Sequence, residues 1–293
     1  MSAAENGRRQ GARRGSLSEA VRRLLIRPGA VGDCILALPA MESLRAAYTE
    51  VWVAEQNVPL IRFADRVQSL GSTGIDWIGL EGVAPPASVL DRLMEFDSII
   101  SWYGFRRPEF RAALEGLPVR FFPALPPPDW KQHAVEFFLT HAAECGGRPV
   151  DPIPRLPCPV TGDANMAVIH PFSGSLKKNW PLERYRQLAD YLNRRLPVQW
   201  CAGPEETLEG AVRMDDLFEL ACWLKSARLY VGNDSGITHL AAAAGVPTVA
   251  IFGPTDPAVW GPRGPQVRVV FAGGAPVDQV AFSSVVKAVE SLL

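Results

Sequence analysis

Short apolar runs alternate along the chain with longer stretches whose apolar residues recur every three or four positions. Runs such as Leu24–Ile26 are typical of buried strands, and stretches such as Cys34–Tyr48 are typical of helices. Strands that alternate with helices indicate a parallel sheet with helices on both faces. In the first half we expect strands at 24–26, 51–54, 77–80, 98–101 and 120–122, and helices at 34–48, 58–63, 89–95, 110–116 and 131–144.

Two proline-rich stretches interrupt this alternation. Residues 123–128 hold four prolines and residues 149–159 hold five. Proline fits neither a central strand nor a helix interior, so we place a domain boundary in the second stretch, between residues 155 and 156. The predicted units are a tail at 1–22, an N-terminal domain at 23–155 and a C-terminal domain at 156–293. In the last we expect strands at 166–169, 197–202, 228–231 and 247–252, and helices at 182–196, 216–226, 235–244 and 278–292.

The bulk properties narrow the class of protein. The 293 residues suit two domains of roughly 130–150 residues each. Apolar residues make up 47% of the chain and the net charge is −1, so no overall field indicates a nucleic-acid partner. The five cysteines are scattered and form no C-x-x-C pair, which argues against a disulfide framework or a zinc site and suits a reducing cytoplasm.

The first 23 residues form a basic segment with six arginines against two glutamates. One interpretation is a disordered, solvated tail. The other is attraction to the anionic surface of a membrane, which predicts peripheral contact with the inner membrane. No apolar run follows the arginines, so the segment does not have the pattern of a secretory signal.

The most informative stretch lies near the C-terminal end. A predicted strand ends at Asp234-Ser235-Gly236, and a predicted helix carrying His239 follows. Such a turn offers free backbone N–H groups at the positive end of the helix dipole, where phosphate binds well. Asp234 is a candidate N-cap of this helix, and the alternative is that it reaches the hydroxyls of a sugar. We therefore predict a nucleotide-sugar site, with a packing role for His239 as the alternative.

A second turn, Gly29-Ala30-Val31-Gly32-Asp33, also joins a predicted strand to a predicted helix. Its spacing matches neither the dinucleotide-binding fingerprint nor a P-loop. The glycines permit a tight turn and the close approach of a ligand. Asp33 is then either a carboxylate at the mouth of the sheet or an ordinary helix cap.

Two further motifs complete a set of four. His170-Pro171 ends a strand and precedes Ser173-Gly174-Ser175 and Lys178-Asn179-Trp180-Pro181, and Gly253-Pro254-Thr255-Asp256-Pro257 follows the last buried strand. These four motifs, in this order and spread over most of the chain, resemble those of glycosyltransferase family 9, the heptosyltransferases of lipopolysaccharide core assembly.

The resemblance implies the GT-B fold, in which two Rossmann-like α/β domains face each other across a cleft. It also implies an inverting glycosyltransferase, which moves a heptose or related sugar from a nucleoside diphosphate, ADP in this family, to a lipopolysaccharide-core or other surface-glycan acceptor. Asp33 corresponds to the general base, and Lys178 would neutralise the leaving diphosphate, with Lys177 as the alternative. The donor site implied by the resemblance comprises Ser173, Ser175, Lys178, Glu206, Asp234, Ser235, Gly236 and His239.

Other expectations concern the acceptor and the alternatives. Arg106 and Arg107 are candidates to bind phosphates of a lipid-linked or polysaccharide acceptor, or are plain surface charge. No metal or cofactor is expected, because no ligand cluster has metal spacing. The segment after Glu206 is short, which suggests a non-catalytic nucleotide-sugar binding protein as one alternative function. Another enzyme class on the same fold, a nucleotide-sugar epimerase, is the other alternative. The expected location is cytoplasmic, with peripheral contact at the inner membrane as an extension.

Overall fold

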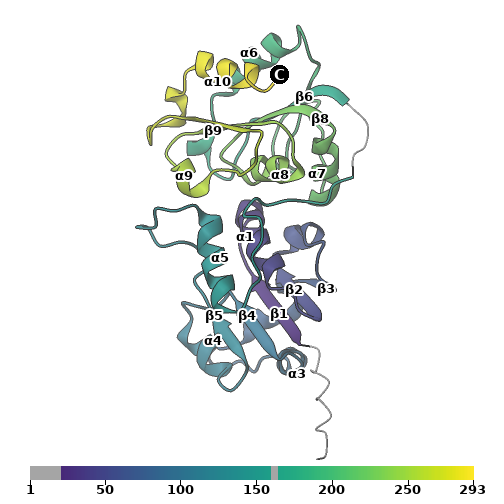
Figure 1. Ribbon diagram of the computed structural model, residues 1–293, viewed down its shortest axis with the longest axis vertical. Coiled ribbons are helices and arrows are strands. Elements are labelled where there is room, and N and C mark those ends of the chain that lie inside the picture. The colour runs from purple at the N-terminus through teal and green to yellow at the C-terminus, as the bar shows by residue number, and fades with distance from the viewer. Residues whose placement is uncertain (1–20, 160–163) are drawn as a thin grey trace, which may run out of the picture.

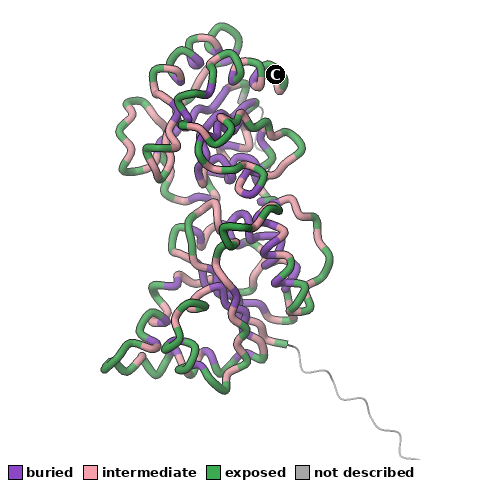
Figure 2. The backbone as a smooth tube through the Cα atoms, turned by 90° about the vertical axis from the view of Figure 1, so that its left-hand side faces the viewer, coloured by how far each residue is buried: buried purple, intermediate pink, exposed green. Residues whose placement is uncertain are grey.

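The computed structural model describes residues 21–159 and 164–293 and contains two α/β halves, one above the other in Figure 1. Each half is built on a five-stranded parallel sheet. Figure 2 shows buried backbone running through the middle of each half. The predicted pair of parallel-sheet α/β domains is confirmed. The predicted tail lies almost wholly outside the described residues, and the boundary at 155 and 156 stays a prediction.

The N-terminal sheet has the strand order β3-β2-β1-β4-β5. Its strands are short and apolar at the centre, where Leu24, Leu25 and Ile26 are buried. The elements are β1 (Arg22–Arg27), α1 (Val31–Ser43), β2 (Tyr48–Val53), β3 (Arg66–Ser69), α2 (Leu70–Thr73), α3 (Ala87–Met94), β4 (Ser98–Ser101), α4 (Pro108–Ala113), β5 (Val119–Phe121) and α5 (Ala134–Glu144), with 3-10 helices η1 (Glu55–Leu60) and η2 (Ile75–Trp77).

The C-terminal sheet has the strand order β10-β9-β8-β6-β7. Its central strand β8 (Ala227–Asn233) is buried except at Arg228, as expected for a strand covered on both faces. The other elements are β6 (Ala164–His170), α6 (Leu182–Leu192), β7 (Val198–Trp200), α7 (Leu217–Lys225), α8 (Gly236–Ala244), β9 (Thr248–Phe252), α9 (Pro257–Trp260), β10 (Val267–Phe271) and α10 (Phe282–Glu290), with 3-10 helices η3 (Leu176–Lys178) and η4 (Val277–Gln279).

Some element predictions were wrong. The strand expected at 77–80 is absent: η2 ends there, and the edge strand is β3, whose sequence RVQS carries a single apolar residue. The helix expected at 58–63 is the 3-10 helix η1. Strand β10 was missed altogether. Each wrong prediction concerns a strand at the edge of a sheet or a short connecting segment. Fewer side chains are buried there, so the pattern of apolar and polar residues is weakest.

The two halves meet through helices rather than through their sheets. Helix α1 packs against α5 within its own half and against α8 of the other half. One hydrophobic cluster runs across this junction and includes Leu36 of α1 and Leu240 of α8, both buried. No helix within the described ranges combines the length and apolar character of a membrane span.

The strand orders predict where a ligand binds. In an open parallel sheet, ligands bind at the carboxyl ends of the strands, where the order reverses direction. In the N-terminal sheet this point lies between β1 and β4, and in the C-terminal sheet between β6 and β8. The loops after these four strands begin at Pro28, Trp102, Pro171 and Asp234.

Candidate functional site

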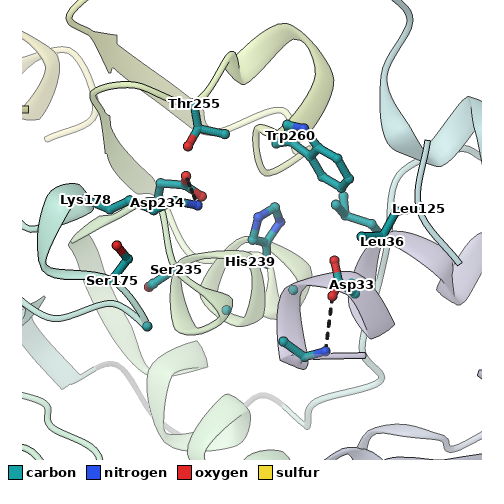
Figure 3. Close-up of a pocket in the computed structure, with 14 residues that line it drawn as sticks. Asp33, Leu36, Leu125, Ser175, Lys178, Asp234, Ser235, His239, Thr255 and Trp260 are labelled. Carbon is teal, nitrogen blue, oxygen red and sulfur yellow. Dashed lines mark hydrogen bonds and ion pairs between the residues drawn. The ribbon is translucent and has the colours of Figure 1, made fainter. Parts of the chain in front are cut away.

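A cavity of about 420 Å³ lies between the two halves (Figure 3). The N-terminal half contributes residues from the start of α1 and one residue from the proline-rich loop after β5. The C-terminal half contributes residues from the loops after β6, β8 and β9 and from α8 and α9. The lining residues are Ala30, Gly32, Asp33, Leu36, Leu125, Gly174, Ser175, Lys178, Asp234, Ser235, Gly236, His239, Thr255 and Trp260.

Asp33 lies in the first turn of α1. Its Oδ2 accepts a hydrogen bond from the Ala30 N–H at 3.1 Å (Figure 3). Ala30 occupies the N-cap position, and the Asp33 side chain bonds back to its N–H as in a capping box. Asp33 thus takes part in capping α1 from the third helical position, and its role as a base stays a prediction. Gly29 has φ +115°, and a Cβ there would come within 3.0 Å of the Asp33 side chain. The tight turn therefore requires glycine at this position.

Two buried polar side chains, those of Arg27 and Asn57, donate hydrogen bonds to main-chain oxygens of this turn. The Arg27 guanidinium, which is fully buried, donates to the main-chain oxygens of Pro28 (2.8 Å) and Asp33 (2.9 Å). Burial lowers the pKa of Arg27, while the nearby Asp33 carboxylate opposes that shift. Asn57, also fully buried, donates to the Gly29 oxygen at 3.0 Å. Arg27 begins the motif that ends at Asp33, but sequence reasoning gave neither Arg27 nor Asn57 this supporting role.

On the opposite wall, Lys178 and Asp234 form an ion pair with Nζ and Oδ2 2.7 Å apart. Asp234 follows β8 and is buried, whereas Lys178 ends η3 and is half-buried. Lys177 is exposed and does not line the cavity. The expectation that Asp234 caps α8 was wrong: Ser235 is the cap, and its Oγ accepts from the Thr238 N–H at 3.4 Å. The Asp234 carboxylate is therefore available to Lys178.

The loop that carries Lys178 is fixed to the sheet by Asn233, which is fully buried at the end of β8. Its Oδ1 accepts from the Trp180 N–H at 2.9 Å and from the Tyr185 hydroxyl at 2.8 Å. Its Nδ2 donates to the Pro171 oxygen at 2.8 Å. One amide side chain thus ties both ends of the loop to β8, and it sets the distance from Lys178 to Asp234.

His239 lies between the two walls, on the first turn of α8, and is only 6% exposed. Burial lowers its pKa to about 4, although the Asp234 carboxylate acts in the opposite direction. The imidazole is therefore neutral at pH 7. A Cβ added to Gly32 would lie 3.2 Å from its Cδ2, so the ring packs against the start of α1.

The first turns of α1 and α8 touch each other at this point. A Cβ on Gly236 would come within 2.8 Å of Val31 Cβ and 3.1 Å of the Gly32 nitrogen. Glycine at 236 allows this close approach. The approach brings the N-termini of α1 and α8 to one cavity. Anions bind favourably at such ends.

Two predicted donor residues lie outside the cavity lining. Ser173 Oγ is 2.8 Å from the Ser175 main-chain oxygen and 2.7 Å from the side-chain amide of Asn179, so it stabilises its own loop. Glu206 accepts from the Gly203 N–H at 2.6 Å and pairs with His170 Nε2 at 3.2 Å. Burial opposes ionisation of Glu206, but these two bonds outweigh it and lower its pKa. The nucleoside role of Glu206 stays a prediction.

The two predicted acceptor residues line a second cavity, of about 410 Å³, which shares Leu125 with the first. Arg107 is half-buried, and its guanidinium donates to the Tyr103 hydroxyl at 2.6 Å and to the Ile78 oxygen at 3.1 Å. Arg106 is exposed and forms no ion pair within the described residues. Of the two cations, Arg106 is the one available to a ligand.

Seven lining residues were not among the predicted site residues. Ala30, Gly32, Gly174 and Thr255 belong to recognised motifs, whereas Leu36, Leu125 and Trp260 belong to none. Thr255 belongs to the Gly253–Pro257 motif, which was recognised in the sequence although none of its residues was assigned a function. Asp256 of that motif caps α9 by accepting from the Ala258 N–H at 2.8 Å. No group of three or more His, Cys, Asp or Glu side chains in the described part of the chain is placed to hold a metal ion.

The known proteins that this chain resembles are glycosyltransferases. Residues 150–277 match the family described as glycosyltransferase family 9 (heptosyltransferase). Lipopolysaccharide heptosyltransferase 1 of Pseudomonas aeruginosa is 30% identical over 178 residues, 52% of this chain and 49% of that protein. The resemblance to glycosyltransferase family 9 is thereby confirmed. The Escherichia coli protein of the same name is 31% identical over 128 residues, 39% of each chain. The aligned segment thus spans less than half the length of these two relatives.

Solved structures show the same fold along nearly the whole chain. A glycosyltransferase family 9 protein from Veillonella parvula superposes with a TM-score of 0.71 at 18% identity, covering 93% of this chain and 97% of that one. The Escherichia coli heptosyltransferase WaaC with ADP superposes with a TM-score of 0.66 at 19% identity, covering 93% and 100%. These likenesses establish the two-domain GT-B architecture.

Proposed function

We propose that this chain is a heptosyltransferase-like glycosyltransferase. It transfers a heptose or related sugar from a nucleoside diphosphate, with ADP as the first candidate, to a lipopolysaccharide-core or other surface-glycan acceptor. The family match and the heptosyltransferase relatives support this reaction class. Transfer takes place with inversion, in a single displacement at the anomeric carbon.

One observation carries the proposal. The cavity between the halves has a carboxylate, Asp33, on one side and a phosphate-type site on the other. That site combines the N-terminus of α8 at Ser235 and Gly236 with the cation Lys178. A transferase needs a base for the acceptor and a binding site for the leaving diphosphate. The two must lie on opposite sides of the transferred sugar.

The donor diphosphate binds at the N-terminus of α8, where the backbone N–H groups and the Ser175 and Ser235 hydroxyls donate to its oxygens. Lys178 exchanges its bond with Asp234 for a bond with phosphate, and it stabilises the negative charge that develops as the diphosphate leaves. Asp234, released from that pair, accepts from a hydroxyl of the sugar. Neutral His239 donates one N–H to the diphosphate.

Asp33 removes the proton from the acceptor hydroxyl while that oxygen attacks the anomeric carbon. Its Oδ2 is held by Ala30, so the carboxylate is oriented before the acceptor arrives. The acceptor sugar occupies the second cavity, where Arg106 pairs with an acidic group. A lipid-linked acceptor would bring the protein to the inner membrane surface from the cytoplasm, with no nucleic acid involved.

The test is to incubate the protein with ADP-heptose and a truncated lipopolysaccharide core, and to compare Asp33→Asn with the wild type. We expect Asp33→Asn to lower kcat by about 10²–10⁴-fold and to leave ADP binding intact. Asp91→Asn is the matched control, because Asp91 is exposed on α3. Conversion of the nucleotide sugar without acceptor would identify an epimerase instead. Binding without turnover, unchanged by Asp33→Asn, would identify a binding protein.

A further inference from the structure

The cavity between the halves has two chemically different ends (Figure 3). At one end lie the polar side chains of Ser175, Lys178 and Asp234. At the other end lie three apolar side chains, Leu36, Leu125 and Trp260. His239 lies between the two ends, and Asp33 lies nearer the apolar end, beside Leu36. A ligand that spans the cavity must therefore present charge at one end and an apolar surface at the other.

Trp260 is the largest side chain at the apolar end. It is the last residue of α9, is half-buried, and its indole N–H donates no hydrogen bond within the described part of the chain. Its ring lies toward Leu36 and Leu125 of the other half (Figure 3). An amphipathic ring with a free N–H, at the wall of a cavity, offers an apolar face and a donor to the same ligand.

Contacts from the other half hold Trp260 in place. Gly261 follows it directly, and the Gly261 oxygen is 2.8 Å from His133 Nε2 at the start of α5. The Val135 N–H donates to His133 Nδ1, so Nε2 carries the proton and donates to Gly261. Two residues further, Arg263 pairs with Glu136 of α5 at 2.7 Å. The apolar end thus forms only when α5 and the loop after α9 are in contact.

We propose that Trp260, together with Leu36 and Leu125, is the platform on which the transferred sugar of the donor rests. This inference rests on the proposed function. In a nucleotide sugar the diphosphate separates the nucleoside from the sugar, so the two lie on opposite sides of Lys178 and the α8 N-terminus. The anomeric carbon must also come close to Asp33. Because Asp33 lies toward the Trp260 end, that end receives the sugar and not the base.

The platform has a chemical consequence for the substrate. The C–H groups on one face of a pyranose pack on an indole ring, and the hydroxyls at its edge remain free for Asp234 and for the indole N–H. Together the three apolar side chains exclude water from Asp33, which limits hydrolysis of the donor. A donor sugar that carries a negative charge on this face is expected to bind poorly, because no cation lines the apolar end in the described part of the chain.

The test is isothermal titration of ADP and of ADP-heptose into the wild type, Trp260→Ala and Trp260→Phe. We expect Trp260→Ala to leave the Kd for ADP within about twofold and to weaken ADP-heptose by about tenfold. Trp260→Phe should recover most of that loss, because it keeps an aromatic face. Trp77→Ala is the matched control, since Trp77 is 52% exposed and lies outside both cavities.

Two outcomes would overturn the platform. Equal weakening of ADP and ADP-heptose in Trp260→Ala would place the nucleoside on the indole, and no weakening of either would leave Trp260 without a role. Thermal unfolding of each variant separates these results from loss of the fold. If the wild type bound neither ADP nor ADP-heptose, the proposed function itself would fail, and the platform with it.

Discussion

The contact between α1 and α8 can be tested with one methyl group. Gly236→Ala places a Cβ 2.8 Å from Val31 Cβ and 3.1 Å from the Gly32 nitrogen, both on the opposite half of the molecule. A relaxed contact between carbon atoms is about 3.5–4.0 Å, so the two helix ends must separate by roughly 1 Å. Asp33 is next to Gly32 and moves with it. The substitution therefore widens the gap between the base and the donor site.

The expected magnitudes differ for stability and for function. Overpacking costs about 1–3 kcal/mol, and replacing a helical glycine by alanine returns up to about 1 kcal/mol. For a protein of this size, that net cost lowers Tm by only a few degrees, about 2–4 °C per kcal/mol. A displacement of about 1 Å in a reacting geometry costs up to about 10²-fold in rate. We expect kcat/KM to fall by about 10- to 100-fold in a protein that remains folded.

The assay combines thermal unfolding, ADP titration and transfer from ADP-heptose, with Gly71→Ala as the control. Gly71 lies in α2, and a Cβ there would meet only Ser69 Oγ at 3.9 Å. The control should match the wild type in all three measurements. The reasoning is refuted if Gly236→Ala retains the wild-type kcat/KM, because the close helix contact would then not set the position of Asp33.

Two further predictions concern charge. Lys178→Ala should weaken ADP binding by about 10- to 100-fold in isothermal titration, since a charge-assisted bond to phosphate is lost, and Lys177→Ala should leave it unchanged because that lysine is exposed. Burial lowers the pKa of His133, His141 and His239 to about 4, below the usual value of about 6.5. The free energy of unfolding should therefore fall as pH drops from about 6.5 towards 4, by about 1.4 kcal/mol per pH unit for His239 alone; a urea midpoint that is equal at pH 7 and pH 5 would contradict this.

The sequence allowed the fold and much of the cavity to be predicted for one physical reason. Parallel strands bring their carboxyl ends to one edge, so motifs that follow β1, β6 and β8 meet, although they are far apart in the chain. Asp33, Lys178 and Ser235 line one cavity on this account. Their chemical roles remain predictions.

What could not be predicted depends on packing and on individual hydrogen bonds. Trp260 reaches the cavity because α5 holds the residue after it, a contact between segments 128 positions apart. Ser173 and Ser175 are equivalent by spacing, but Ser173 bonds within its own loop, to the Ser175 main chain and the Asn179 side chain, whereas Ser175 lines the cavity. The capping of α8 shifted by one residue from Asp234 to Ser235, a distinction that motif spacing does not resolve.

The meeting of two helix N-termini has an electrostatic consequence. Each end carries the equivalent of about half a positive charge, and glycine contacts at 32 and 236 hold the like ends together. The two like ends repel each other, and the Asp33 carboxylate and the Asp234–Lys178 pair lie beside them. A bound diphosphate adds negative charge between the halves. Ligand binding should thus strengthen the association of the two domains, and the departure of the nucleotide should weaken it. This coupling does not require a dedicated hinge segment.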